Sequence, residues 1–215
     1  MSAVIHVEHV TKQFKDEFVL NDVSLYVNEG EIIGIVGKNG SGKTMLFKCI
    51  CGFVRPTSGS ITVKGKRIGA DVDFAQDVGI IIETPGFLPY YSGFTNLRLL
   101  ADIKRKVTDA DIESVMKLVG LNPGDKKAVY KYSLGMRQRL GLAQALMERP
   151  SILILDEPMN GLDQDGIEEM RLLLKKMSQE GITILIASHN KEDISLLCDR
   201  VFRMDKGTIS DMENT

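Results

Sequence analysis

A glycine-rich segment at positions 37–44 constrains the fold of this chain more than any other feature. It matches the pattern G-x-x-x-x-G-K-S/T in full and follows the apolar run at positions 32–36. In that context the pattern is typical of a loop between a strand and a helix, whose backbone N–H groups surround the phosphates of a nucleoside triphosphate. The predicted phosphate-binding residues are Gly37, Lys38, Asn39, Gly40, Ser41, Gly42, Lys43 and Thr44. Lys43 adds a positive charge at the phosphates, and the Thr44 hydroxyl can bind Mg²⁺.

The apolar pattern around this loop predicts an α/β fold. Apolar and polar residues alternate at positions 4–10 and 24–27, as in antiparallel strands with one solvent-exposed face. Continuous apolar runs at 78–82, 152–155 and 182–187 are typical of strands buried on both faces, and 164–179 has the pattern of an amphipathic helix. We therefore predict a P-loop NTPase with a mainly parallel core sheet and an N-terminal antiparallel β subdomain.

Residues from about 85 to 135 depart from this pattern. An aromatic, turn-rich segment at 85–91 is followed by helical periodicity. Thr108 is suited to cap the N-terminus of a helix, and Gly120 is suited to end it. We expect a single domain over residues 1–215, with an α-helical lobe inserted at about 85–135.

Composition and charge exclude several classes of protein. The net charge of −2 gives no overall attraction to nucleic acid or to anionic lipid. No apolar run approaches the roughly 18 residues of a membrane-spanning helix, and the N-terminus lacks the pattern of a signal peptide. The three cysteines are too few for a metal site and are predicted to be buried, reduced thiols. These features predict a cytoplasmic protein with no nucleic-acid partner.

Two carboxylates and a histidine follow the apolar runs that are predicted to be core strands. Asp156 and Glu157 come directly after 152–155, where Asp156 can hold Mg²⁺ and Glu157 can act as general base for an attacking water. His189 comes after 182–187, where it can contact the γ-phosphate or that water. The alternative is a pair of solvent-facing acids and a structural histidine. The P-loop nearby favours the catalytic interpretation.

Ser133 and Gly135 begin another helical pattern, which continues through Leu140. A free hydroxyl at a helix N-terminus is suited to bind a phosphate. It is also suited to cap its own helix. The residues alone leave both interpretations open.

Taken together, these motifs resemble those of the nucleotide-binding subunits of ABC transporters over nearly the whole chain. The segment at 37–44 is similar to the family's Walker A motif, 152–157 to Walker B, 132–136 to the signature motif, 160–163 to the D-loop and 188–189 to the switch histidine. The resemblance implies that Phe14 stacks on the adenine of ATP, that Glu83 faces Mg²⁺ at the Q-loop position, and that Asp163 of the D-loop belongs to the nucleotide site.

The resemblance also implies a dimer. Two ATPase domains meet head to tail, so that Ser133 and Gly135 of one close over the γ-phosphate held by Lys43 of the other. Hydrolysis, with Glu157 as base and His189 as switch, then releases the pair. Because this chain carries one set of motifs, its partner is a second copy or a paired ABC ATPase subunit.

Two departures from the family pattern narrow the resemblance. The signature reads Tyr-Ser-Leu-Gly-Met where Leu-Ser-Gly-Gly-Gln is usual, so Leu134 replaces a glycine and Met136 a polar residue. Glu83 replaces the Q-loop glutamine. This combination is similar to the bacitracin-resistance and lantibiotic-immunity branch of bacterial ABC exporters.

The leading hypothesis is an ATPase, peripheral on the inner face of the cell membrane, that drives export of an antimicrobial peptide or drug through a separate integral membrane subunit. The aromatic segment at 87–94 is either part of the docking site for that subunit or the core of the lobe. One alternative is a soluble ABC-type ATPase not coupled to transport, acting on ribosomes or DNA. Another is a regulatory module that does not hydrolyse ATP.

Overall fold

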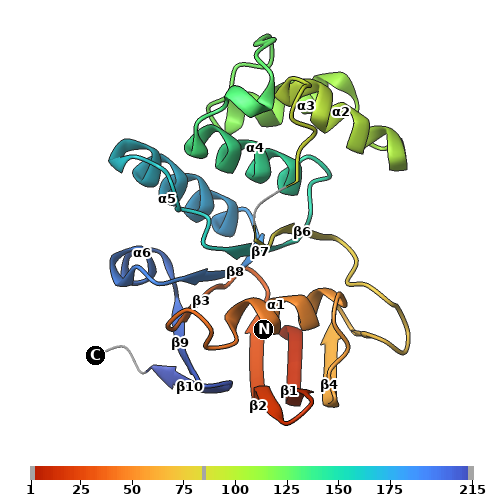
Figure 1. The fold of residues 1–215 in the computed structure, drawn as a ribbon, viewed down its shortest axis with the longest axis vertical. Coiled ribbons are helices and arrows are strands. Elements are labelled where there is room, and N and C mark those ends of the chain that lie inside the picture. Colours follow the sequence, from red (N-terminus) through yellow and green to blue (C-terminus); the bar gives the residue numbers. More distant parts are fainter. Residues whose placement is uncertain (1–2, 84–85, 213–215) are drawn as a thin grey trace.

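Two β-sheets organise the chain (Figure 1). The structure, a computed structural model, describes residues 3–83 and 86–212. The first sheet has the strand order β2-β1-β4-β5, and the second has the order β10-β9-β3-β8-β7-β6. Helix α1 (Lys43–Cys51) shares a core with both sheets, helices α4, α5 and α6 cover the opposite face of the second sheet, and α2 and α3 pack on α4.

The first sheet is antiparallel, as predicted. It consists of β1 (Ala3–Phe14), β2 (Glu17–Asn28), β4 (Ser58–Val63) and the short β5 (Lys66–Arg67). Both β1 and β2 are longer than the alternating segments at 4–10 and 24–27. The register between them shifts after Val7 and again after Val10, and such bulges interrupt the two-residue alternation on which the prediction depends.

The second sheet is parallel except at one edge. Strands β3 (Ile32–Val36), β6 (Val78–Ile81), β7 (Ile152–Asp156), β8 (Thr183–Ser188) and β9 (Arg200–Asp205) run parallel, and β10 (Thr208–Met212) pairs antiparallel with β9. Every residue of β8 is buried, since the strand lies between β3 and β7 and is covered on both faces. The predicted α/β fold with a mainly parallel core sheet is confirmed.

Alternate residues of the core strands supply two separate hydrophobic cores. Ile152 and Ile154 of β7 pack with α1 and the antiparallel sheet. Leu153 and Leu155 of the same strand pack with α4, α5 (Gln164–Gln179) and α6 (Lys191–Leu197). This division explains the continuous apolar runs, because a strand with a core on each face needs apolar residues at every position.

The helical lobe contains α2 (Gly93–Lys104), α3 (Asp109–Leu118), a 3₁₀ turn (Val129–Lys131) and α4 (Leu134–Leu146). Thr108 caps α3: its hydroxyl accepts a hydrogen bond from Asp111 N at 3.3 Å, and the Asp111 carboxylate accepts one from Thr108 N at 3.0 Å. Gly120 adopts a φ of +76°, the left-handed conformation that ends helices. Both predicted boundaries of α3 are therefore present.

The aromatic segment at 87–94 is partly buried and partly exposed. Phe87 and Phe94 pack against the core of the lobe. Leu88, Tyr90 and Tyr91 are exposed. The segment therefore contributes to the core and also leaves apolar surface uncovered.

Cys49 and Cys51 lie buried in α1, as predicted, whereas Cys198 is only partly buried. Burial raises the pKa of Cys49 to about 11 and that of Cys51 to about 12, so both thiols stay protonated at neutral pH. Within residues 3–83 and 86–212, the structure has no helix long and apolar enough to span a membrane.

Candidate nucleotide-binding site

The glycine-rich loop connects β3 to α1 and is held close to neighbouring backbone. Gly42, the residue before α1, has a φ of +110°, and a Cβ there would lie 2.7 Å from the Val19 carbonyl oxygen. A Cβ on Gly37 would overlap the Met204 carbonyl oxygen. Glycine is required at both positions, because a side chain would disrupt the loop that directs its N–H groups inward.

Lys43 lies within the loop rather than in solvent. Its side-chain ammonium donates hydrogen bonds to the carbonyl oxygens of Gly37 at 2.7 Å and Lys38 at 3.3 Å. The residue is only 6% exposed. A buried ammonium held at the first turn of α1 places positive charge where the helix dipole also favours an anion.

Ser41 supplies a test of whether phosphate fits this loop. Its side-chain oxygen is buried and is the one such side-chain atom without a hydrogen-bond partner in the described residues. An unpaired buried hydroxyl is unfavourable unless a ligand supplies its hydrogen-bond partner. Ser41 lines a hollow of about 410 Å³ together with the loop residues 39–44, Val19, Lys48, Glu83, Asp156 and Glu157. The donors present therefore fit a bound triphosphate.

Thr44 and Asp156 form the part of the hollow suited to a hard cation. The Thr44 hydroxyl donates to a carboxylate oxygen of Asp156 at 2.6 Å. Burial raises the pKa of Asp156, and this effect outweighs the opposing hydrogen bond from Thr44. The negative charges of Glu157 and Glu83 raise it as well, and Lys43 lowers it. A hydroxyl and a carboxylate so placed are the oxygen ligands that Mg²⁺ uses beside a nucleotide.

Glu157 and His189 meet at the edge of the same hollow. The imidazole Nδ1 of His189 lies 2.8 Å from Oε2 of Glu157. Because a carboxylate only accepts hydrogen bonds, the contact requires the proton on Nδ1. Glu157 has a φ of +52°, an uncommon left-handed conformation for a residue other than glycine, and its N–H donates to the Ala187 carbonyl at 2.9 Å. The structure thus brings together Glu157 and His189, which are 32 residues apart in the sequence.

Glu83 faces this hollow with a cationic partner that the sequence analysis missed. Its Oε1 atom lies 2.5 Å from the ammonium of Lys48. Lys48 follows Thr44 by four residues on α1, so the two side chains project from the same face of the helix. That spacing is the signal that identifies Lys48 as a site residue.

Seven predicted site residues are not among those that line this hollow. Gly37 and Lys38 accept hydrogen bonds from Lys43, and His189 contacts Glu157. The other four are Phe14, Ser133, Gly135 and Asp163. Phe14 is half-exposed, with the Lys12 ammonium 4.7 Å from its ring centre. Ser133 caps α4 by accepting from Met136 N at 3.1 Å, and Asp163 caps α5 by accepting from Gly166 N at 3.0 Å. Gly135 lies in the first turn of α4. Their proposed roles toward nucleotide remain predictions.

The unusual Leu134 of the signature segment packs on the segment that follows Glu157. A Cβ placed on Gly161 would overlap the Leu134 side chain. Leucine is tolerated at this position because Gly161 leaves space for it. The replacement of a glycine therefore directs an apolar side chain onto the chain's own backbone.

The fold and the loop define a P-loop ATPase built as a nucleotide-binding cassette. The profile of the family described as "ABC transporter" matches residues 20–160, and the chain belongs to that family. The ABC transporter ATP-binding protein YybJ of Bacillus subtilis, itself uncharacterized, is 44% identical over 98% of this chain and 96% of its own length.

Two relatives are named for the transport of bacitracin and of lantibiotics. The bacitracin transport ATP-binding protein BcrA of Enterococcus faecalis is 40% identical over 100% of this chain and 70% of its own length. The lantibiotic transport ATP-binding protein SrtF of Streptococcus pyogenes is 34% identical over 96% of this chain and 89% of its own. The predicted resemblance to that branch is confirmed.

A solved structure confirms the fold. The dimeric ATP-binding cassette MJ0796, in a post-hydrolysis state bound to ADP and Pi, superimposes with a TM-score of 0.86 at 22% identity. The superposition covers 98% of this chain and 100% of that one. The chain described here is an ABC transporter ATPase, and the predicted enzyme class is confirmed.

Replacing Ser41 by Ala tests the fit of the loop to phosphate. We expect ATP to bind about 10- to 100-fold more weakly, because a hydrogen bond to a charged group is lost. The thermal midpoint of the free protein should stay the same or rise, since the hydroxyl has no partner there. Fluorescent-nucleotide titration and calorimetry measure the two quantities, and unchanged affinity would contradict the assignment.

Proposed function

We propose that this chain is the ATP-hydrolysing subunit of an exporter and works as a head-to-tail dimer with a second copy or a paired ABC ATPase. The contact between Glu157 and His189, beside the Thr44–Asp156 pair, is the observation that carries the proposal. It combines a general base, a group that orients it and a phosphate-binding loop in one hollow.

The residues around this hollow have different roles in hydrolysis. Lys43 and Ser41 hold the phosphates, and Thr44 and Asp156, with Glu83, would hold Mg²⁺. When bound, Mg²⁺ neutralises the charge that develops on the phosphate oxygens. Ser133, Gly135 and Asp163 would complete the site of the partner subunit, and Phe14 would stack on the adenine.

Glu157 acts as the base through one of its two carboxylate oxygens. His189 donates to Oε2, which leaves Oε1 to accept the proton of the attacking water. The left-handed backbone at Glu157 fixes the direction from which that carboxylate reaches the hollow. His189 thus orients the base.

Replacement of Glu157 by Gln separates binding from hydrolysis. The amide keeps the shape of the side chain and cannot accept the proton, so we expect kcat to fall by about 10²- to 10⁴-fold. ATP should then hold the dimer together, which size-exclusion chromatography with and without ATP detects. The double variant with Lys43→Ala is the control and should stay monomeric. Unchanged turnover would exclude Glu157 as the base.

The Lys48–Glu83 pair should set the Mg²⁺ dependence of nucleotide binding. In Lys48→Met, the Glu83 carboxylate loses its competing cation, and we expect half-maximal binding at about two- to fivefold lower Mg²⁺. Glu83→Gln should shift the midpoint the other way. Lys175→Met, on the exposed part of α5, is the control. Equal midpoints in all variants, measured by fluorescent-nucleotide binding, would remove Glu83 from the metal site.

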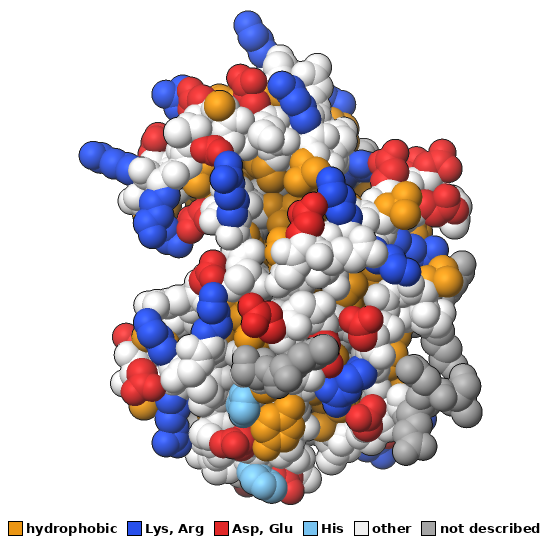
Figure 2. All heavy atoms as spheres, turned by 180° about the vertical axis from the view of Figure 1, so that it is seen from behind, with side chains coloured by type: hydrophobic (Ala, Val, Ile, Leu, Met, Phe, Trp, Pro, Cys, Tyr) orange, Lys and Arg blue, Asp and Glu red, His pale blue; other side chains and the backbone are white. Residues whose placement is uncertain are grey.

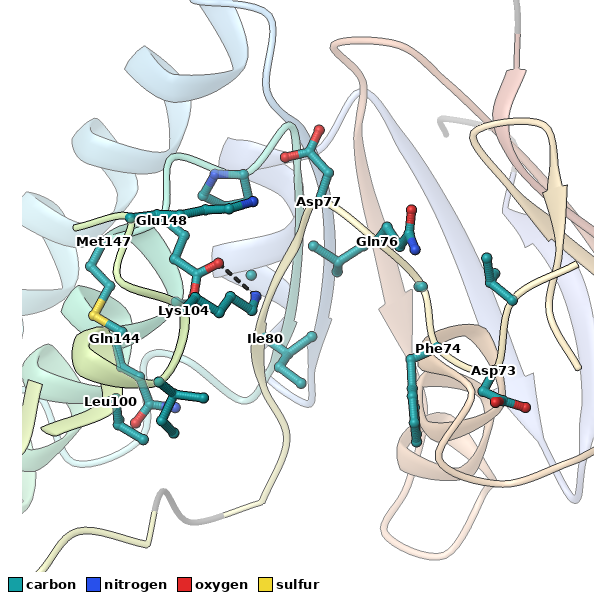
Figure 3. A pocket seen from close by; sticks show the side chains of 18 residues that line it. Asp73, Phe74, Gln76, Asp77, Ile80, Leu100, Lys104, Gln144, Met147 and Glu148 are labelled. Atoms are coloured by element: carbon teal, nitrogen blue, oxygen red, sulfur yellow. Dashed lines mark hydrogen bonds and ion pairs between the residues drawn. The ribbon is translucent and has the colours of Figure 1, made fainter.

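A second and larger cavity is the proposed docking groove for an integral membrane subunit. It has a volume of about 1000 Å³ and lies between β6, α2, α4 and the loop before β6 (Figure 3). Phe74, Ile80, Leu100 and Ile103 supply its apolar lining, and the ion pair between Lys104 and Glu148 lies beside them at 2.7 Å. A segment with an apolar face flanked by charges would fit such a groove.

Strand β6 connects this groove to the nucleotide. Val78, Gly79 and Ile80 of β6 line the groove, and Glu83, two residues beyond the end of the strand, lines the phosphate hollow. A partner that moves β6 would therefore move Glu83 and its contact with Lys48. This connection favours a membrane-bound exporter over an ATPase that is not coupled to transport.

The charge distribution on one face gives no support to a nucleic-acid partner. Lys, Arg, Asp and Glu side chains are interspersed over the face shown in Figure 2. A strand of nucleic acid requires a continuous basic surface. We propose that the subunit works on the cytoplasmic face of the membrane, and that its cargo is an antimicrobial peptide or drug, as the names of BcrA and SrtF suggest.

Aspartate substitutions in the groove test the docking proposal. Phe74→Asp and Ile103→Asp should reduce recovery of a multi-span membrane protein with this chain by at least about tenfold, because a charge replaces an apolar contact. ATP binding should be retained. Leu172→Asp on α5, also exposed, is the matched control. Recovery of the wild-type chain from detergent-solubilised membranes without a membrane protein would favour the soluble alternative.

A further inference from the structure

Gln138 is a buried amide in α4 that contacts the backbone of the catalytic glutamate. The residue is 9% exposed, and its Nε2 atom donates a hydrogen bond to the Glu157 carbonyl oxygen at 3.3 Å. Burying an amide is unfavourable unless it is hydrogen-bonded, so an apolar residue would fill this position at lower cost if packing alone mattered. The position of the amide indicates a role at Glu157.

The peptide groups on both sides of Glu157 are held in place. On one side, the Glu157 N–H donates to the Ala187 carbonyl of β8. On the other side, the Glu157 carbonyl oxygen accepts hydrogen bonds from Asn160 N at 3.2 Å and from Gln138 of the helical lobe. Because φ is +52° between these groups, the direction of the carboxylate depends on the bonds that hold them.

Helix α4 contacts the segment after β7 at a second point. Leu134 packs on Gly161, and a Cβ on Gly135 would lie 3.1 Å from the Gly161 carbonyl oxygen. Ser133 and Gln138 are five residues apart, about 7.5 Å along the helix at about 1.5 Å per residue. The start of α4 and the segment from Glu157 to Gly161 are thus joined at both ends.

We propose that Gln138 is a positioning residue that transmits the position of Ser133 to Glu157. This inference rests on the proposed dimer, in which Ser133 closes over the nucleotide of the partner subunit. Occupancy of that site would fix α4, and through Gln138 it would fix the base of this chain's own site. The two ATP sites would then be coupled through α4, with Gln138 as the link at the catalytic end.

Replacing Gln138 by Met removes the donor and nearly preserves the volume. We expect kcat to fall about tenfold and the Hill coefficient for ATP to move toward one, since the base is less well oriented and less dependent on the other site. KM should stay within about twofold, because Gln138 does not line the phosphate hollow. Gln179→Met, the same change at an exposed position of α5, is the control.

A second variant distinguishes positioning from packing. In Gln138→Glu, the ionised carboxylate cannot donate to the Glu157 carbonyl, whereas the protonated carboxyl can. Its kcat relative to wild type should therefore rise as pH is lowered from 8 toward about 6, since burial raises a carboxyl pKa above about 4.3. A side chain that only fills space would give a ratio independent of pH.

Variants that also carry Glu157→Gln test the dimer independently of the role of Gln138. Gln138→Met in that background should still form the ATP-dependent dimer, because binding is intact. If Glu157→Gln alone forms no dimer with ATP, the proposed dimer and the coupling through it are both wrong. If the dimer forms and Gln138→Met has the kcat and Hill coefficient of Gln179→Met, the role of Gln138 alone is overturned.

Discussion

The pairing of β8 between β3 and β7 is the interaction on which the rest of the site depends. In that register Val36 lies opposite Ser188, and Asp156 lies opposite Ala187, so the three strands end at the same level. The phosphate loop follows β3, Asp156 ends β7 with Glu157 next, and His189 follows β8. Parallel hydrogen bonding therefore assembles at one sheet edge groups that lie far apart in the sequence.

The sequence could predict those site residues that come directly after a buried parallel strand. The loop at 37–44, the Asp156–Glu157 pair and His189 each follow an apolar run, and the direction of a buried strand determines where the next residue lies. Lys48 and Gln138 gave a weaker signal, since each lies inside a helix, where a polar side chain is most often one that faces solvent. Strand lengths in the first sheet were underestimated because bulges in the β1–β2 pairing break the alternation.

The signature segment shows how a departure from the family pattern can be accommodated within one chain. Leu134 stands where the family has glycine, and its side chain contacts Gly161 while remaining half-exposed. Ser133 still caps the helix. The departure therefore adds an apolar contact between α4 and the segment after β7.

Two of the three acids that line the hollow, Glu83 and Glu157, have a left-handed backbone, as do eight other non-glycine residues of the described chain. Glu83 has a φ of +61° and Glu157 a φ of +52°, and such conformations in residues other than glycine cost about 1–3 kcal/mol each. Glu83 lies just beyond β6, the strand that lines the docking groove, and Glu157 follows β7 and contacts α4. Each strained acid thus lies at the junction between the nucleotide and a surface proposed to meet another subunit. Their side chains can respond to small shifts of β6 or α4, because the surrounding contacts, rather than intrinsic backbone preference, determine their direction.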